Sequence, residues 1–572
     1  MLLGWIWLSP AFALELQVLV TGLEGVEEQN VLTFLDIYQE RDSERLEEHR
    51  LEHLHRVAPE QIREALQPFG YYKVEVDAEL RRPERGETAW RASYRVSPGP
   101  AVKIAVVDYR LTGPGADDPA LPKEFGMQPG DVLLHAAYET AKQAVVDAIS
   151  REGYLDARME RHRVIVDLET YGARVQLHFS TGPQYYLGTV TFKQDLLDED
   201  FLQRFLTFEP GTVYDPARLL GLQSSLLGSE YYDEVEIVPL KEAAQDNVVP
   251  LEVVAHPNKP NKYRVGLGFV SDSGPRITLD WTRRYIGRRG HKMKAELSWS
   301  QTLQKLKGEY RIPLEKPTQD YFAIKPEWRG YDTASRQGDL YKIGVLHSVA
   351  RSNGWRRTTG IDYRLEDFSA AEETNEQVKE LVPHITWDKT VADDPIYTSR
   401  GYRLKYQLLG AVEGLISPAS YLSGTARVKW IRSFWEDYRL LTRADLGMTL
   451  ANSVFDLPAS RRFYTGGDNS IRGWALDVLG PNDPDTNDAV GGRYLAVGSL
   501  ELERKVYKDW SGAVWTDFGN AFDPDFDKQV EVGAGFGVRW KSPVGQVRFD
   551  VAFAMTKPGN PIRLVLVVGP DL

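Results

Sequence analysis

Residues 463–474 carry the side chains best suited to a binding role, because three glycines, Gly466, Gly467 and Gly473, lie around Arg472. Glycines beside a basic residue can form a phosphate-binding loop, which requires a preceding strand, a Gly-Lys-Ser/Thr ending and a following helix whose amides hold the phosphate. The residues after Gly473 contain neither a Lys-Ser/Thr pair nor a convincing helical pattern. A nucleotide site is therefore disfavoured, and the arginine needs another role.

Other chemistry finds little support in the sequence. There is no cysteine, which excludes disulfides and thiolate metal sites. His53 and His55 lie in a charged segment without an HExxH motif or a His/carboxylate cluster, so we expect them to be solvated. No GxSxG nucleophile motif is present. The sequence predicts no catalytic residues, no metal and no cofactor, and its net charge of −13 disfavours nucleic acid as a partner.

The first half of the chain repeats itself. An amphipathic, helix-like stretch runs into an extended one at three tyrosines, and each tyrosine is followed after 29 residues by a proline: Tyr71 and Pro100, Tyr154 and Pro183, Tyr231 and Pro260. Such self-similarity marks repeated modules, each predicted as a strand, two helical stretches and two strands. Sheet edges of such modules can pair with a strand of another chain, although plain spacers are an alternative.

In the first module the predicted elements are a strand over residues 15–21, a helix starting near Asn30, a second helix with Pro59 at its first position, and strands over 72–80 and 90–96.

From Tyr263 onward the chain alternates between apolar and polar residues. Met293, Ala295, Leu297 and Trp299, for example, alternate with Lys292, Lys294, Glu296 and Ser298. Both a soluble sandwich or barrel and an outer-membrane barrel show this pattern. Many runs reach about ten residues, as a tilted strand crossing a bilayer requires, and Tyr and Trp recur near their ends. We therefore predict a membrane barrel of 16 antiparallel strands.

Arg472 then lies in a long loop, about 455–492, between the eleventh and twelfth runs. A charged loop can fold into a barrel lumen and meet polar wall residues. Alternation places Glu501 on the inward face of the next run, and Asp517 and Gly519 follow on the run after that. The two carboxylates are the predicted partners of Arg472, whose planar fork suits them.

The two ends of the chain carry further signals. An apolar run over residues 2–8 followed by Ala11-Phe12-Ala13 predicts a signal peptide over 1–13, although it lacks a basic residue and a short buried segment is the alternative. At the barrel seam, Gly266 and Gly268 weaken the first strand. Pro570, after Gly569, cannot donate a ladder hydrogen bond in the last strand. A soft seam is expected where the two strands meet.

In the loop around Arg472 and in the strands predicted to contact it, the chain resembles the outer-membrane assembly and secretion superfamily that includes BamA, TamA and the two-partner secretion transporters. Ile471-Arg472-Gly473-Trp474 is similar to its sixth-loop signature, with tryptophan for the usual Phe or Tyr. The fuller motif runs Gly466, Gly467, Asp468, Asn469, Ser470, Ile471, Arg472, Gly473, Trp474. Segments 499–501, 515–519, 394–395, 399–402 and 542–545 are further matches, and the repeats resemble three POTRA domains. Three such domains and the full loop motif most resemble the TamA branch.

The resemblance implies a domain order of signal peptide 1–13, POTRA 1 14–97, POTRA 2 98–184, POTRA 3 185–261 and outer-membrane β-barrel 262–572. It implies a protein of the bacterial outer membrane with periplasmic POTRA domains. Such a protein inserts β-barrel or autotransporter-type clients into the lipid bilayer and is no enzyme. A periplasm-spanning, inner-membrane-anchored partner of the TamB type is expected at the POTRA domains. A polypeptide-secreting pore of the two-partner type is the alternative.

Overall fold

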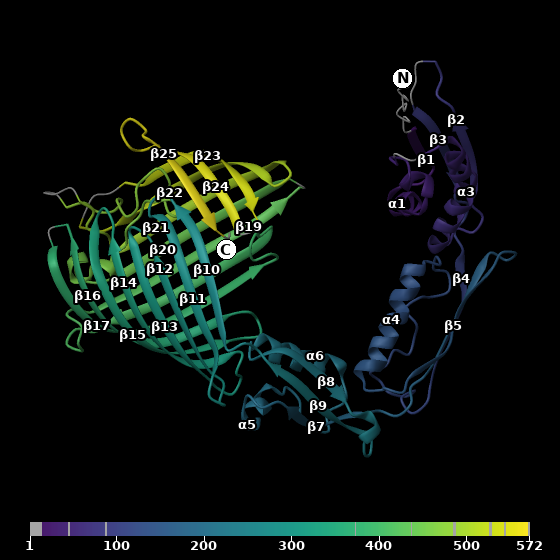
Figure 1. Cartoon of the computed structure of the whole chain (residues 1–572), viewed down its shortest axis with the longest axis horizontal. Helices are drawn as coiled ribbons and strands as arrows, with labels where there is room; N and C mark the ends of the chain where they lie inside the picture. Colours follow the sequence, from purple (N-terminus) through teal and green to yellow (C-terminus); the bar gives the residue numbers. More distant parts are fainter. Residues whose placement is uncertain are drawn as a thin grey trace, which may run out of the picture. The chain divides into compact units, whose positions relative to one another are not determined.

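The computed structural model describes residues 14–43, 46–85, 89–371, 373–435, 437–483, 488–525, 529–542 and 545–569. The expected signal peptide, Pro543, Val544 and Pro570 lie outside these ranges. Three small α+β modules precede a closed barrel (Figure 1). In the described part of the chain, no helix is long and apolar enough to cross a membrane.

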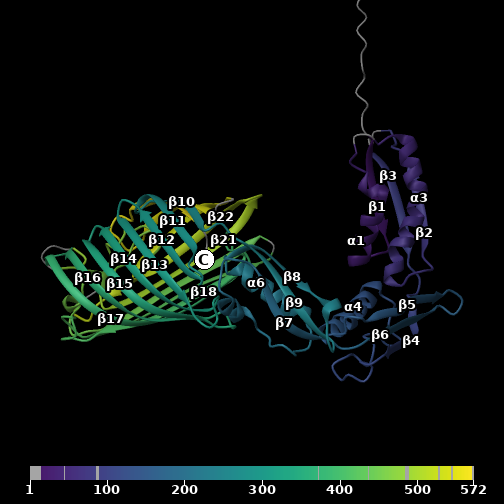
Figure 2. The ribbon, with the colours of Figure 1, turned by 60° about the horizontal axis from the view of Figure 1, so that its bottom comes forward.

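The three modules share one sheet topology, in which the last strand lies between the other two: β1-β3-β2, β4-β6-β5 and β7-β9-β8. In the first module β1 runs parallel to β3, and β2 runs antiparallel to it. Its elements are β1 (Glu15–Thr21), α1 (Gly25–Phe34), α2 (Asp36–Gln39), α3 (Glu48–Leu66), the 3-10 helix η1 (Gln67–Phe69), β2 (Glu75–Arg81) and β3 (Ala89–Ser97) (Figure 2). Each sheet therefore keeps two edge strands.

The second module consists of β4 (Lys103–Thr112), α4 (His135–Arg151), β5 (Arg158–Asp167) and β6 (Gly172–Ser180). The third consists of β7 (Tyr186–Lys193), α5 (Glu199–Leu202), η2 (Gln203–Phe205), α6 (Pro216–Gly228), β8 (Tyr232–Pro239), η3 (Lys241–Ala243) and β9 (Val248–Pro257). One of the two helical stretches expected in the second module is a run of turns between β4 and α4. Residues Phe192–Thr207 and Leu222–Glu236 of the third module form one compact unit with the barrel.

The core of the first module corrects three predictions. The first helix begins at Gly25 and not near Asn30. Pro59 lies inside α3, because buried Leu51, Leu54, Ala58 and Ile62 continue the apolar face of that helix across it. His55 is half-buried and its Nδ1 lies 2.8 Å from the Tyr94 hydroxyl, so it is not solvated. Burial lowers the pKa of His55, which favours the neutral form of the imidazole.

The barrel contains sixteen antiparallel strands, β10 to β25, in sequence order. They are β10 (Asn261–Val270), β11 (Gly274–Ile286), β12 (His291–Trp299), β13 (Leu303–Pro313), β14 (Asp320–Asp332), β15 (Arg336–Ala350), β16 (Arg356–Ala370), β17 (Glu373–Ala392), β18 (Arg400–Ala411), β19 (Tyr421–Phe434), β20 (Tyr438–Leu450), β21 (Tyr494–Tyr507), β22 (Trp510–Phe522), β23 (Glu531–Ser542), β24 (Gly545–Ala554) and β25 (Ile562–Gly569). The predicted barrel and its strand number are confirmed. Its first strand begins one residue before the expected boundary at 262, and the domain boundaries stay a prediction.

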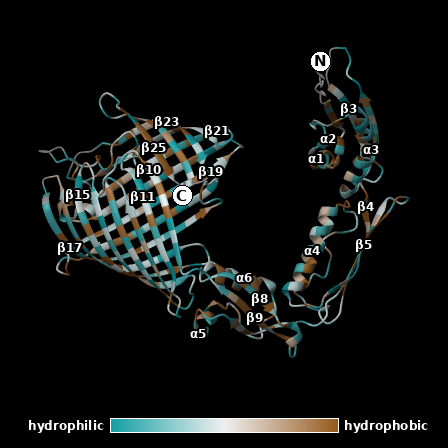
Figure 3. Cartoon of the chain, viewed as in Figure 1, coloured by the Kyte–Doolittle hydropathy of each residue, from teal (hydrophilic) through white to brown (hydrophobic). Residues whose placement is uncertain are grey.

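The barrel wall separates apolar from charged side chains. Along β21 the outward Leu500 and Leu502 are exposed, whereas the inward Ser499, Glu501 and Glu503 are buried. Brown and teal residues alternate along the strands of the barrel (Figure 3). Because successive strand residues point to opposite faces, this pattern produces an apolar exterior that suits lipid and a charged interior.

The barrel closes through a short seam between the first and last strands. Within the described residues, β10 and β25 share a single registered pair, Val270 with Val567, whereas β24 and β25 share eight. The Leu566 amide also donates to the Ser271 hydroxyl oxygen at 2.6 Å.

Of the glycines expected at this seam, Gly268 lies against the last strand, since a Cβ there would be 3.8 Å from the carbonyl oxygen of Val568. Gly266 faces Thr278 on β11 instead, and Gly569 pairs with Gln546 on β24.

Candidate functional site in the barrel lumen

The loop that carries the glycine-arginine motif connects β20 to β21 and spans residues 451–493, slightly more than expected. It includes two short 3-10 helices, η4 (Val454–Asp456) and η5 (Ala459–Arg461). Backbone hydrogen bonds tie Phe463 to Gly492 and Thr465 to Leu479 in both directions. The loop is therefore folded on itself, and its tip presents residues 466–474.

Backbone geometry explains the glycines of this tip. Gly466, Gly467 and Gly473 have φ angles of 98°, 97° and 95°, a region that side chains strongly disfavour. The Gly467 amide donates to the Trp474 carbonyl oxygen at 3.0 Å and closes the tip. A Cβ on Gly473 would also lie 3.0 Å from the backbone nitrogen of Ala554 on β24. The glycines bring Arg472 close to the barrel wall.

Arg472 is buried and bonded to both predicted carboxylates. Its Nε and Nη2 donate to the two oxygens of Asp517 at 2.7 and 3.0 Å, and its Nη1 donates to Glu501 at 2.7 Å. Its backbone amide also donates to Asp517 at 3.0 Å. The guanidinium carbon lies 3.7 Å from the centre of the Trp515 ring, within cation–π range. Burial lowers the pKa of Arg472, but Asp517 and Glu501 outweigh burial and hold the pKa above its ordinary value.

A second arginine, which sequence reasoning missed, completes this network. Arg539 on β23 donates to Glu501 at 2.6 and 2.8 Å and lies 2.8 Å from Asp550 on β24. Asp550 in turn accepts from Trp515 Nε1 at 3.0 Å. Asp550 occupies an inward position of the alternating run 547–554, so the polar face of that run held a signal for it. Arg472 of the loop thus joins Arg539 and three carboxylates of the four consecutive strands β21 to β24 in one buried cluster.

Glycines in the wall allow close approach of a neighbouring strand, of the loop and of the cluster. Gly519 has a φ of 138°, and a Cβ there would lie 2.0 Å from the Ala496 carbonyl oxygen. A Cβ on Gly533 would lie 2.1 Å from the carbonyl oxygen of Arg472, and one on Gly537 would lie 2.1 Å from Asp550. Such distances are far below van der Waals contact, so these positions admit only glycine without a shift of the wall.

Other motif residues hold the loop tip in place. Ile471 is buried with Leu479 and Val497 on β21, and Trp474 packs against this cluster. Arg443 on β20 donates to the backbone carbonyl oxygens of Asn469 and Ser470. These two carbonyl oxygens of the loop thereby obtain hydrogen-bond partners from the barrel wall.

Asp468 joins the loop to both sides of the seam. The Asp468 amide donates to the carboxylate of Asp272, in the turn after β10, and the Asp272 amide donates to Asp468 at 3.1 Å. Arg563 on β25 bonds to Asp272 and lies 4.0 Å from Asp468. Burial, and then the charge of Asp272, raises the pKa of Asp468 to about 7. Sequence spacing gave no signal for Asp272 or Arg563.

The fold and the loop network define an outer-membrane β-barrel protein with POTRA modules. Residues 261–565 match the Omp85 superfamily domain, and the chain belongs to the Omp85 superfamily. Residues 17–98 match the first POTRA domain of the TamA type, so within that superfamily the chain is TamA-like. Among the described residues, no group of His, Asp or Glu has the arrangement of a metal site.

Known relatives agree with this family. The chain is 23% identical over 507 residues to the outer membrane protein assembly factor BamA of Neisseria meningitidis, covering 76% of this chain and 62% of the relative. It is 33% identical over 115 residues to BamA of Nitratidesulfovibrio vulgaris, covering 19% and 14%. The chain thus spans less than two thirds of these relatives. The crystal structure of Haemophilus ducreyi BamA lacking POTRA domains 1–3 has the same fold, with a TM-score of 0.70, 16% identity, and coverage of 82% of this chain and 99% of that one.

Proposed function

We propose that this protein helps insert β-barrel or autotransporter-type clients into the bacterial outer membrane, with its POTRA modules in the periplasm and no covalent catalysis. The similar BamA proteins are named as assembly factors, which supports an assembly role. The sheet of the first POTRA module has β1 and β2 as its edge strands. An extended client or partner strand can add to either edge by backbone pairing.

The observation that carries this proposal is the contrast between the seam and the rest of the wall. Among the described residues β10 and β25 share one registered pair, while β10 and β11 share ten. Each ladder hydrogen bond contributes about 0.5–1.5 kcal/mol, so the seam is the least costly place to part the barrel. Within the described residues, positions 261–269 of β10 pair with β11 and have no registered partner on β25, which leaves this edge available for a client strand.

The lumen loop has a complementary role in this proposal. Arg472, Asp517 and Glu501 hold the loop tip against β21 and β22, which lie three or four strands from the seam in the barrel order. Asp468 and Arg563 connect the same loop to the seam itself. The loop therefore keeps the wall organised while the seam parts.

A disulfide across the seam tests this function. Val270 and Val567 are register partners, and antiparallel partners have Cα atoms about 4.5–5.5 Å apart, within disulfide range. The chain has no cysteine, so the variant V270C/V567C carries only the intended pair. In cells depleted of the natural protein, we expect the oxidised variant to lose client assembly and a reductant to restore it.

A matched disulfide controls for rigidity. Val265 and Leu279 are partners on β10 and β11, so V265C/L279C links two strands that stay together. This variant should assemble clients when oxidised. Full activity of the oxidised seam variant would show that seam opening is not required, whereas equal loss in both variants would attribute the loss to cross-linking in general.

The partner is the second part of the proposal. We infer a large, inner-membrane-anchored, β-rich partner of the TamB type at the POTRA modules, because the first module is TamA-like. Affinity capture from gently solubilised membranes, followed by mass spectrometry, tests it. Recovery of one secreted passenger in place of such a partner would favour a polypeptide-secreting pore and overturn the insertion function.

A further inference from the structure

Three neighbouring barrel strands place basic residues directly opposite one another. Arg403 on β18 is the register partner of Lys429 on β19, and Lys429 is the partner of Arg443 on β20. In the adjacent row Lys405 lies opposite Arg427, and Asp388 and Asp445 flank this pair. Like charges directly opposite each other destabilise a sheet. The row of Arg403, Lys429 and Arg443 therefore concentrates positive charge on one part of the wall, where an added anion is favoured.

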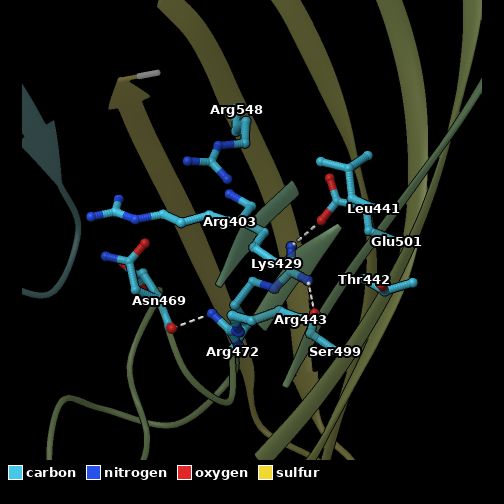
Figure 4. A pocket seen from close by; sticks show the side chains of 11 residues that line it. Arg403, Lys429, Leu441, Thr442, Arg443, Asn469, Arg472, Ser499, Glu501 and Arg548 are labelled. Atoms are coloured by element: carbon cyan, nitrogen blue, oxygen red, sulfur yellow. Dashed lines mark hydrogen bonds and ion pairs between the residues drawn. The ribbon is translucent and has the colours of Figure 1, made fainter. Parts of the chain in front are cut away.

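The row lines a cavity in the lumen. The cavity has a volume of about 320 Å³, and Arg548 on β24 and Arg472 of the loop complete its basic lining. Figure 4 shows Arg403, Lys429, Arg443 and Arg548 gathered around this space. We call it the lumen cation pocket. A liquid water occupies about 30 Å³, so the pocket has room for a polyatomic ion with several waters.

The pocket carries surplus positive charge. Five basic side chains line it, against two carboxylates, Asp468 and Glu501. Glu501 already bonds to Arg472 and Arg539. Asp468 already contacts the Asp272 amide and lies near Arg563. The lining as a whole therefore has more basic side chains than carboxylates.

The guanidinium of Arg443 has one buried N–H group that needs a hydrogen-bond acceptor. Its two terminal nitrogens donate to loop carbonyl oxygens, which fixes the guanidinium at the pocket wall. Within the described structure its Nε is buried without a hydrogen-bond partner, and the nearest carboxylate, Asp445, lies 3.6 Å away, too far for a hydrogen bond. A buried donor without a hydrogen-bond partner is destabilising, so an acceptor is expected nearby.

We propose that the lumen cation pocket binds a phosphate-type oxyanion, carried by a phospholipid headgroup or by free phosphate. Arginine forks match the tetrahedral oxygens of phosphate, and lysine adds a mobile point charge. The ligand is held by side chains and not by a glycine-rich backbone cradle. Binding neutralises the opposed cations and does not depend on the proposed insertion function.

Calorimetric titration of the full chain, folded in a zwitterionic detergent, tests this site. The probes are inorganic phosphate and dihexanoyl phosphatidylglycerol. We expect saturable binding that weakens as salt is raised, and a Kd at least tenfold higher in the variant R403Q/K429Q. The control K305Q/K379Q removes the same charge from strands outside the pocket and should bind within twofold of the natural chain.

The probes distinguish the two sources. Binding of both identifies phosphate itself as sufficient, and binding of phosphatidylglycerol alone identifies a lipid headgroup. If R403Q/K429Q fails to fold, R548Q on β24 removes a different basic side chain from the same pocket. Absence of saturable binding for both probes, unchanged affinity in the pocket variants, or capture of an acidic peptide by a chain that ignores both probes would overturn the proposal.

Discussion

Replacement of Arg472 by alanine removes the charged partner of a fully buried carboxylate. Asp517 is 0% exposed and accepts three hydrogen bonds from Arg472, two from the guanidinium and one from the backbone. In R472A the backbone bond can persist, and the Ser499 hydroxyl still donates to Asp517 at 2.5 Å. Glu501 keeps Arg539. The variant therefore leaves one carboxylate, Asp517, without its cation.

The expected magnitude follows from that count. Removing one partner of a buried ion pair costs about 3–5 kcal/mol. Because the remaining donors compensate Asp517 in part, we expect about 3 kcal/mol, lost from docking of the loop tip. Every 1.4 kcal/mol is tenfold, so the docked state becomes about 100-fold less favoured. The barrel wall keeps its ladders, so assembly activity should fall more than folding.

Hydrogen exchange at fixed pH measures this change. Protection of the amides in residues 463–479 should fall by about two orders of magnitude in R472A. Strands outside the cluster should keep their protection. Gel mobility before and after heating reports the folded barrel, and complementation in depleted cells reports assembly.

An exposed arginine provides the control for R472A. Arg504 on β21 is exposed and lies 5.5 Å from the Tyr438 ring, so R504A should change stability by about 0.5 kcal/mol or less. Unchanged protection of the loop in R472A, or wild-type complementation, would refute the reasoning. Equal losses in R472A and R504A would show that general charge, and not the buried pair, is responsible.

Three further changes test other parts of the site. The pKa of Asp468 is raised to about 7. The protonated carboxyl therefore stabilises the folded protein fully below the ordinary pKa of an aspartate, and this stability is lost as the pH rises toward 7. Between pH 4 and 7 the unfolding midpoint of D468N should lack this pH-dependent loss of stability. G519A should lower the yield of folded, heat-modifiable barrel, because its Cβ would lie 2.0 Å from a carbonyl oxygen, whereas G512A on the same strand meets nothing within 4 Å and should fold normally. W474F should be neutral or slightly stabilising by thermal unfolding, because the indole Nε1 is buried and has no partner among the described residues; a loss of more than about 1 kcal/mol would contradict this reading.

The sequence alone determined the architecture, because the relevant signals are local. Alternation along Met293–Trp299 and its many counterparts fixes which side chains face outward, and closure of an antiparallel barrel requires an even number of such strands. The repeated tyrosine and proline spacing marks the modules. The glycines around Arg472 predict a special turn, and inward charges at Glu501 and Asp517 predict its partners.

The tertiary structure decided which distant charges meet. Arg539 and Asp550 join the Arg472 cluster only because the register of β23 and β24 brings them level with β21 and β22. Asp272 and Arg563 are 291 positions apart and meet at the seam through barrel closure. The row of Arg403, Lys429 and Arg443 depends on the register of three strands. Alternation fixes the face of a side chain, but its height along the wall depends on strand register, which local sequence does not encode.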